Sequence, residues 1–258
     1  MTITRVQGSA RGTSSTDSIG VSMASTPTQG NLLIATILVY YYVVVSISQT
    51  GVTWTKQVSK QQTSLYQTDV EIWAGIVGSG ANKDLTISLT PNANGGAIAD
   101  VCEYSGLLTS GFLDKTAIAS GTYTRTQVTG TTATTTQSNE LWIGAIANTQ
   151  DKAPNELSSP ANGFTLLDGA SYGGGPIHAH AYLERIVSDV GKASSGTTST
   201  VYTKYEAYAG CIATFKASGI TYSPKTRSSL PNTMMTMLNN KMLFSACNRF
   251  PKLNLRRI

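Results

Sequence analysis

The residues best suited to chemistry in this 258-residue sequence are two pairs of titratable side chains. In "PIHAHAYLE", His178 and His180 are two residues apart. On a strand they would share one face, where they could bind a metal if a neighbouring strand supplied a third ligand. They are the only histidines, and no cysteine or acid is placed by sequence to complete the site. We therefore predict no metal and no cofactor, and we expect the pair to face solvent or a subunit interface.

The second pair is acidic. In "DVEIW", Asp69 and Glu71 share a strand face with Trp73, which resembles the carboxylates and aromatic residues of jelly-roll glucanases. Retaining glycosidases hold two carboxyls about 5–5.5 Å apart, in environments that separate their pKa values. A later repeat of this stretch has no acid at the matching positions, and the "ExDxxE" pattern of one such family is absent. A carbohydrate-active module is therefore our alternative hypothesis.

No other catalytic motif is present. The sequence has no nucleophile elbow, phosphate-binding loop, dinucleotide fingerprint or calcium loop, and "SYGGGP" is a glycine-rich turn with no helix after it. We therefore predict no catalytic residues.

The composition indicates the elements that must position these side chains. Charged residues make up 13% of the chain, about half the usual share of about 25%. Thr, Val, Ile and Tyr favour strands, whereas Gly, Asn and Ser favour turns. In the first part of the chain we expect seven short strands with a period of two, over Thr4–Ser9, Ser18–Ala24, Leu32–Val39, Val52–Lys60, Val70–Val77, Leu85–Leu89 and Ala97–Tyr104.

Four segments recur in the same order at offsets of 109 to 113 residues. "LLIATI" resembles "LWIGAI", "GVTWTKQVS" resembles "GFTLLDGAS", "EIWAGIV" resembles "YLERIV", and "AIADVCEYSG" resembles "GCIATFKASG". We predict an all-β fold, an antiparallel β-sandwich of jelly-roll or immunoglobulin-like type, with two sequence-similar halves. The halves cover 1–107 and 121–219 and are joined by a connection over 108–120. They form either two domains or one fused jelly roll.

The stretch Leu32–Ile47 carries no charge. Its length of about 16 residues is short of the roughly 20 that a spanning helix needs, so we predict no membrane span. Its latter part, Tyr40–Ile47, is either a strand packed into the core or against the other half, or a partner or glycan contact built from Tyr40, Tyr41 and Tyr42. The chain has twelve Tyr against five Phe. Tyr202, Tyr205 and Tyr208 add to the candidate binding residues, because tyrosine suits sugars and protein interfaces.

Two further features concern cysteine and charge. We expect Cys102 and Cys211 to be reduced and buried, as small core residues. Residues 221–258 hold seven of the 19 Lys and Arg and no acid, so the rest of the chain is near neutral and no specific nucleic-acid binding is expected. The basic, Met-rich tail over 220–258 is expected to be partly helical, docked on a subunit or an anionic surface, disordered, or a non-native extension.

The segments "ITRVQGSA", "PTQGNLLIATI", "GVTWTKQV", "EIWAGIV" and "CEYSGL" resemble an uncharacterised family of duplicated β-sandwich proteins found in phage, archaeal-virus and bacterial genomes. The resemblance implies a virion or surface structural role without a known catalytic set. The sequence shows no signal peptide, so we expect synthesis in the cytoplasm and a place in a virion or on a cell surface. Our main hypothesis is a non-enzymatic structural or attachment protein. It would act through contacts with its own copies or other structural subunits, and through glycan binding.

Overall fold

The computed structural model describes residues 2–64, 67–90, 95–150, 156–169, 171–172, 177–199 and 206–219. Met1–Gly219 form one compact unit. The tail over 220–258, with its predicted helix, docking or disorder, lies outside the described residues. The described residues form antiparallel strands, and none forms a helix that could span a membrane. The predicted all-β sandwich is therefore confirmed.

The strands follow each other along the chain in two sets. The first set is β1 Thr4–Ser14, β2 Ser18–Ser22, β3 Leu32–Tyr40, β4 Val44–Ser48, β5 Val52–Gln62, β6 Thr68–Val77, β7 Asp84–Leu89 and β8 Gly96–Ser105. The second set is β9 Leu113–Thr122, β10 Thr126–Thr134, β11 Glu140–Gln150, β12 Leu157–Ser158, β13 Thr165–Asp168, β14 Ser171–Tyr172, β15 Ile177–Val187, β16 Lys192–Ser199 and β17 Ala207–Lys216.

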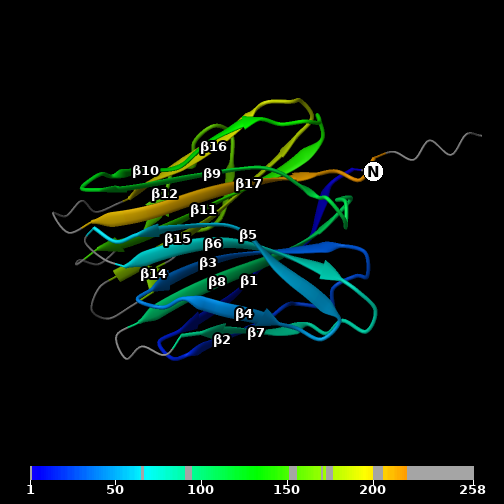
Figure 1. Ribbon diagram of the computed structural model, residues 1–258, viewed down its shortest axis with the longest axis horizontal. Coiled ribbons are helices and arrows are strands. Elements are labelled where there is room, and N and C mark those ends of the chain that lie inside the picture. Colours follow the sequence, from blue (N-terminus) through cyan, green and yellow to red (C-terminus); the bar gives the residue numbers. More distant parts are fainter. Residues whose placement is uncertain are drawn as a thin grey trace, which may run out of the picture. The chain divides into compact units, whose positions relative to one another are not determined.

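Each set makes one large and one small sheet (Figure 1). In the first set the large sheet has the order β1-β8-β3-β6-β5, and the small sheet β2-β7-β4 packs on it. In the second set the large sheet has the order β9-β17-β11-β15-β13, with β14 also paired to β15, and the small sheet is β10-β16-β12. We call these the first and the second sandwich. When strands are matched in chain order, with β14 left out, the sheet orders of the two sandwiches are the same.

The four recurring segments lie on matched strands. They fall on β3 and β11, at the starts of β5 and β13, on β6 and β15, and on β8 and β17. The registers show that the last match is displaced by two residues: Tyr104 pairs with Leu32 and Phe215 pairs with Leu141, an offset of 111 instead of 113. The expected connection over 108–120 contains most of strand β9. Duplication itself stays a prediction.

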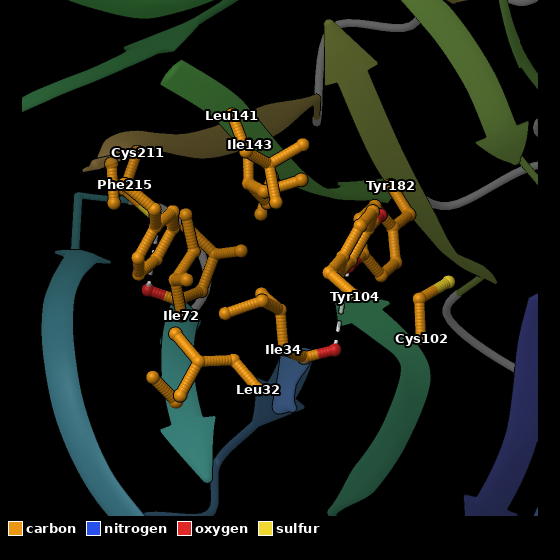
Figure 2. Close-up of a cluster of buried hydrophobic side chains, with 14 of the residues drawn as sticks. Leu32, Ile34, Ile72, Cys102, Tyr104, Leu141, Ile143, Tyr182, Cys211 and Phe215 are labelled. Atoms are coloured by element: carbon orange, nitrogen blue, oxygen red, sulfur yellow. Dashed lines mark hydrogen bonds between the residues drawn. The ribbon is translucent and has the colours of Figure 1, made fainter. Parts of the chain in front are cut away.

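The two large sheets pack face to face and form one apolar core (Figure 2). The first sandwich contributes residues such as Leu32, Ile34 and Ile72, and the second contributes residues such as Leu141 and Ile143. These side chains alternate along their strands with others that face the small sheets, so the central strands are buried on both faces.

Both cysteines of the described residues lie in this shared core. Cys102 and Cys211 are free thiols with no measurable exposure, as expected from the sequence. Burial raises the pKa of Cys102 to about 12 and that of Cys211 well above its usual value. Their thiols are therefore protonated and unreactive at neutral pH.

Contacts between the large sheets occur in matched pairs. The ring centroids of Tyr40 and His178 are 4.3 Å apart, and the hydroxyls of Thr68 and Thr149 are 2.9 Å apart. Thr149 is the counterpart of Tyr40 on β11, and His178 is the counterpart of Thr68 on β15. One contact is therefore the matched copy of the other. This exchange is what an approximate twofold relation between the large sheets produces.

Candidate functional site

The tyrosines that the sequence singled out point in different directions. Tyr40 is 4% exposed and packs on His178 between the large sheets, whereas Tyr42 is 1% exposed and lies in the core of the first sandwich. A Cβ on Gly95 would come within 2.3 Å of the Tyr42 ring, so only glycine leaves room for that ring. Tyr41 is 36% exposed. Of the three, Tyr41 alone presents its ring at the surface.

Tyr41 has a left-handed backbone, with φ of 57°. This conformation is uncommon for a bulky side chain and costs roughly 1–3 kcal/mol. The amide of Tyr41 donates to the carbonyl of Gln67 at 2.9 Å, and its ring lies 4.3 Å from that of Tyr40. The turn between β3 and β4 therefore holds an exposed aromatic ring in a fixed place above a buried one.

Strand β4 continues from this turn as an edge strand, since β7 is its only neighbour in the sheet order of the described residues. Val44 and Ile47 face the core, whereas Val43 and Val45 are 42% and 60% exposed. The strand contains no charge and no proline, the usual protection of a sheet edge. The matched strand β12 is only two residues long. We name Tyr41, Val43 and Val45 the β4 edge patch.

The second tyrosine group does not form a surface cluster in the described residues. Tyr208 is 6% exposed, and its ring lies beside Gly121, where a Cβ would come within 2.7 Å of it. Tyr202 and Tyr205 lie outside the described residues. A binding role for this group stays a prediction.

The two histidines are buried between the large sheets, so the expectation that they face solvent is wrong for both. His178 is 4% exposed, and its Nδ1 lies 3.1 Å from the hydroxyl of Thr149. Burial lowers the pKa of His178 to about 4, because a buried imidazolium loses its hydration. In the described residues no group of three His, Cys, Asp or Glu side chains could hold a metal ion.

His180 belongs to an ion network that joins the two sandwiches. Its Nδ1 lies 2.8 Å from Oδ2 of Asp100, which also accepts from Nη2 of Arg11 at 2.9 Å. Arg11 Nη2 in turn lies 2.6 Å from Oδ1 of Asp168 on β13. Burial by itself would raise the pKa of Asp100, but the hydrogen bonds and charges of His180 and Arg11 outweigh it and lower the pKa to about 2. These contacts fix the two large sheets against each other.

The acidic pair is also enclosed. Glu71 is 1% exposed, lies 2.7 Å from Nζ of Lys56, and accepts a hydrogen bond from the Trp73 indole. Asp69 is 8% exposed, and burial, followed by the charge of Glu71, raises its pKa to about 7. Neither carboxyl presents an open face to a polysaccharide, since both side chains are buried.

A polar cluster that the sequence did not reveal lies inside the second sandwich. Glu206, just before β17, has no measurable exposure. Its Oε1 accepts from Nδ2 of Asn148 and from Nε2 of Gln127, each at 2.8 Å. Burial raises the pKa of Glu206, against the hydrogen bonds of Asn148, Ser199 and Gln127. The one sequence signal for this cluster is the alternation of polar residues in "TQVTGTT". The same alternation is typical of a strand whose polar residues face solvent, so it does not predict a buried cluster.

The outer face of the same small sheet carries a groove of about 270 Å³. Its lining is rich in hydroxyl and amide side chains, including Thr126, Thr131, Ser159, Asn162, Ser194 and Thr198. Ser159 and Asn162 are left-handed, with φ of 53° and 57°, and they lie between β12 and β13. The first sandwich has only the short turn Gln49–Gly51 at the matching place.

No protein-family model, curated protein or solved structure matches this chain. The resemblance to duplicated phage and archaeal-virus sandwich proteins therefore stays a prediction, and the residues themselves carry the argument for function.

Proposed function

We propose that this chain is a non-enzymatic structural or attachment protein of a virus particle or cell-surface assembly, and that it acts through subunit contacts. The observation that carries the proposal is the β4 edge patch, an unprotected strand edge flanked by exposed apolar side chains. The place in a virion rests only on the resemblance of the sequence segments.

A second copy of the chain is the partner that fits this edge. Two β4 strands can pair antiparallel about a twofold axis, so that each satisfies the free backbone groups of the other. The exposed parts of Val43 and Val45 would then lose contact with water, and each would gain a part of the about 1.5–3 kcal/mol that full burial of such a side chain contributes. Tyr41 would lie at the rim of such a contact, where its hydroxyl can stay hydrated.

Light scattering of the purified protein tests this contact. We expect a dimer or larger assembly, and we expect Val43→Lys combined with Val45→Lys to yield folded monomers whose unfolding temperature no longer depends on protein concentration. The control is Val190→Lys, because Val190 is 57% exposed elsewhere on the molecule. A wild-type monomer at high concentration, or a double variant that still assembles, would contradict the proposal.

The groove on the second small sheet favours a second candidate, a carbohydrate-binding module. Its hydroxyl and amide groups can exchange hydrogen bonds with a sugar, although its volume is at the low end for ligand sites. A glycan array and a hydrolysis screen distinguish the candidates. Binding that is lost in Thr131→Val with Thr198→Val, without turnover, supports attachment through glycans. Turnover would instead support the enzyme.

A further inference from the structure

The polar cluster of the second sandwich contains oxygen atoms that its own residues do not satisfy. Glu206 Oε2, Gln127 Oε1 and Thr197 Oγ1 are buried and have no hydrogen-bond partner in the described part of the chain. All three side chains are at most 2% exposed. A buried acceptor without a partner costs about 1–3 kcal/mol, so three in one place require an explanation.

These atoms belong to neighbouring residues. Gln127 Nε2 donates to Glu206 Oε1. This hydrogen bond brings Gln127 Oε1 and Glu206 Oε2, the two oxygens that it does not use, close to each other. Gln127 and Thr197 are direct partners in the β10–β16 ladder. Asn148 donates to the same Glu206 oxygen from β11. The amide donors are thus turned toward Oε1, the Ser199 hydroxyl also interacts with this carboxylate, and the remaining oxygens form an acceptor-rich site.

We propose that the second sandwich binds an alkali metal cation, Na⁺ or K⁺, through Glu206 Oε2, Gln127 Oε1 and Thr197 Oγ1. Carboxylate, amide and hydroxyl oxygens are ligands for hard cations. A monovalent ion also matches the charge, because one carboxylate is the only acid of the cluster and the nearby Arg125 is exposed. The ion satisfies the three oxygens and neutralises a buried carboxylate, which is otherwise costly.

The matched interior of the first sandwich explains why only one half has this site. Ile19 and Ile87 are direct partners in the β2–β7 ladder, as Gln127 and Thr197 are in the β10–β16 ladder. Gly95 lies directly before β8, as Glu206 lies directly before β17. The first sandwich therefore offers no oxygen ligand at these positions.

Thermal unfolding of the full chain at pH 7.5 tests the site. We compare NaCl and KCl with N-methylglucamine chloride at equal ionic strength. A cation at about 100 times its Kd should raise the unfolding temperature by about 5 °C or more, with saturation. Glu206→Gln should abolish this rise, and Thr197→Val should shift its midpoint to higher cation concentration.

Glu140→Gln is the matched control. Glu140 is also a fully buried glutamate of the second sandwich, with one oxygen bonded to the Trp142 indole and the other without a partner in the described residues, but it lies outside the cluster of Gln127, Thr197 and Glu206. This variant should keep the cation response. Crystals grown with Rb⁺ in place of K⁺ give a readout that does not depend on the variants folding, because an anomalous peak is expected beside Glu206.

Three results would overturn the proposal. The first is the same unfolding temperature in all chlorides, with no Rb⁺ peak. The second is a cation response that survives Glu206→Gln. The third is a stability that falls with rising pH and is insensitive to the cation, because a proton on Glu206 would then take the place of the ion.

Discussion

The two sandwiches have the same strand order but different interiors. The residues of β2 and β7 that face the first large sheet are apolar, namely Ile19, Val21, Leu85, Ile87 and Leu89. The buried residues of β10 and β16 are mostly polar, namely Gln127, Thr129, Thr132, Ala193, Ser195, Gly196, Thr197 and Ser199. One arrangement of strands thus accommodates both an apolar interior and a hydrogen-bonded one.

The hydroxyls of the second interior replace missing backbone contacts. Two register shifts interrupt the β10–β16 ladder, around Thr131. At this place Thr129 Oγ1 accepts from the amide of Ser195 at 3.0 Å and donates to its carbonyl at 3.2 Å. Thr132 Oγ1 accepts from the amide of Ala193 at 2.9 Å. Side chains that would be costly in a dry core are therefore satisfied by a bulged strand.

The largest effect is expected from placing the polar chemistry of the second sandwich in the first. Ile87→Ser should lower the free energy of unfolding by about 3–5 kcal/mol, because it leaves a cavity and a hydroxyl without a partner in an apolar core. The reverse change, Thr197→Val in cation-free buffer, should alter it by less than about 1 kcal/mol, since Thr197 Oγ1 has no partner in the described residues. Chemical denaturation measures both. Equal losses would remove the distinction between the interiors.

At the contact between the large sheets, the two sandwiches also differ in how they respond to pH. The counterpart of Thr68 in the second sandwich is His178, whose pKa is lowered to about 4. A histidine with a folded pKa below its unfolded value of about 6.5 stabilises the fold above that value and loses the contribution as the pH falls through 4. The loss should reach about 3 kcal/mol. His178→Thr should remove this acid sensitivity.

Denaturation curves between pH 7 and pH 4 measure the effect. The His178 window lies above that of Asp100, whose pKa of about 2 makes its own contribution disappear only as the pH falls below about 4. Val190→Lys serves as a control that leaves the contact unchanged. If the free energy of unfolding of His178→Thr still fell between pH 7 and pH 4, another group would be responsible for the proton uptake.

A smaller effect tests the role of the hydroxyls in the bulged ladder. Thr129→Val keeps the shape of the side chain but removes both hydrogen bonds to Ser195. We expect a loss of about 1–2 kcal/mol, since two backbone groups lose a buried partner. Val21→Thr in the first sandwich should cost at least as much for the opposite reason. If Thr129→Val left the free energy of unfolding unchanged, water would have replaced these hydrogen bonds.

Much of the fold could be predicted from sequence where side chains alternate. Each of the seven strands expected in the first half overlaps an observed strand, and β1 differs most, extending to Ser14 instead of Ser9. Strand β4 was only one of the alternatives for its segment, because Tyr41 makes the turn before it in a conformation usually taken by Gly or Asn. Strand β9 was not predicted, and most of it fell in the expected connection over 108–120. It lies at a sheet edge, and its sequence "LDKTAIASGT" lacks the continuous apolar face that marks a strand.

The candidate site was less predictable. Alternation along a strand shows which residues share a face, but it does not show whether that face packs against the other large sheet, the small sheet or solvent. Tyr40 and Tyr42 were grouped by residue type, yet one lies between the large sheets and the other in the first core. The inward polar residues of β10 look the same in sequence as residues that face solvent. Only the positions of Glu206 and Asn148, distant in the chain, show that Gln127 is buried.

The smallest expected effect is a gain at a buried acid that the second sandwich lacks. Asp69 corresponds to Ala179, since the two pair with the matched residues Val39 and Asn148. Its pKa is raised to about 7 by burial and by Glu71. An acid with a raised folded pKa destabilises the fold progressively as the pH rises from about 4 through 7. Asp69→Asn should therefore stabilise the protein by about 1 kcal/mol at pH 8 and by nothing at pH 4.

The pKa of about 7 already includes the attraction of Lys56 and Lys60, and the expected gain is small because the surroundings of a buried acid relax and admit water when it ionises. Urea denaturation at pH 8 and pH 4 gives the difference, and Asp84→Asn on the exposed start of β7 is the control. A loss of stability at pH 8 would show that the lysines outweigh burial. Asp69 would then belong with Asp100 as an acid whose charge stabilises the fold, and the two halves would differ in their charges as well as in their interiors.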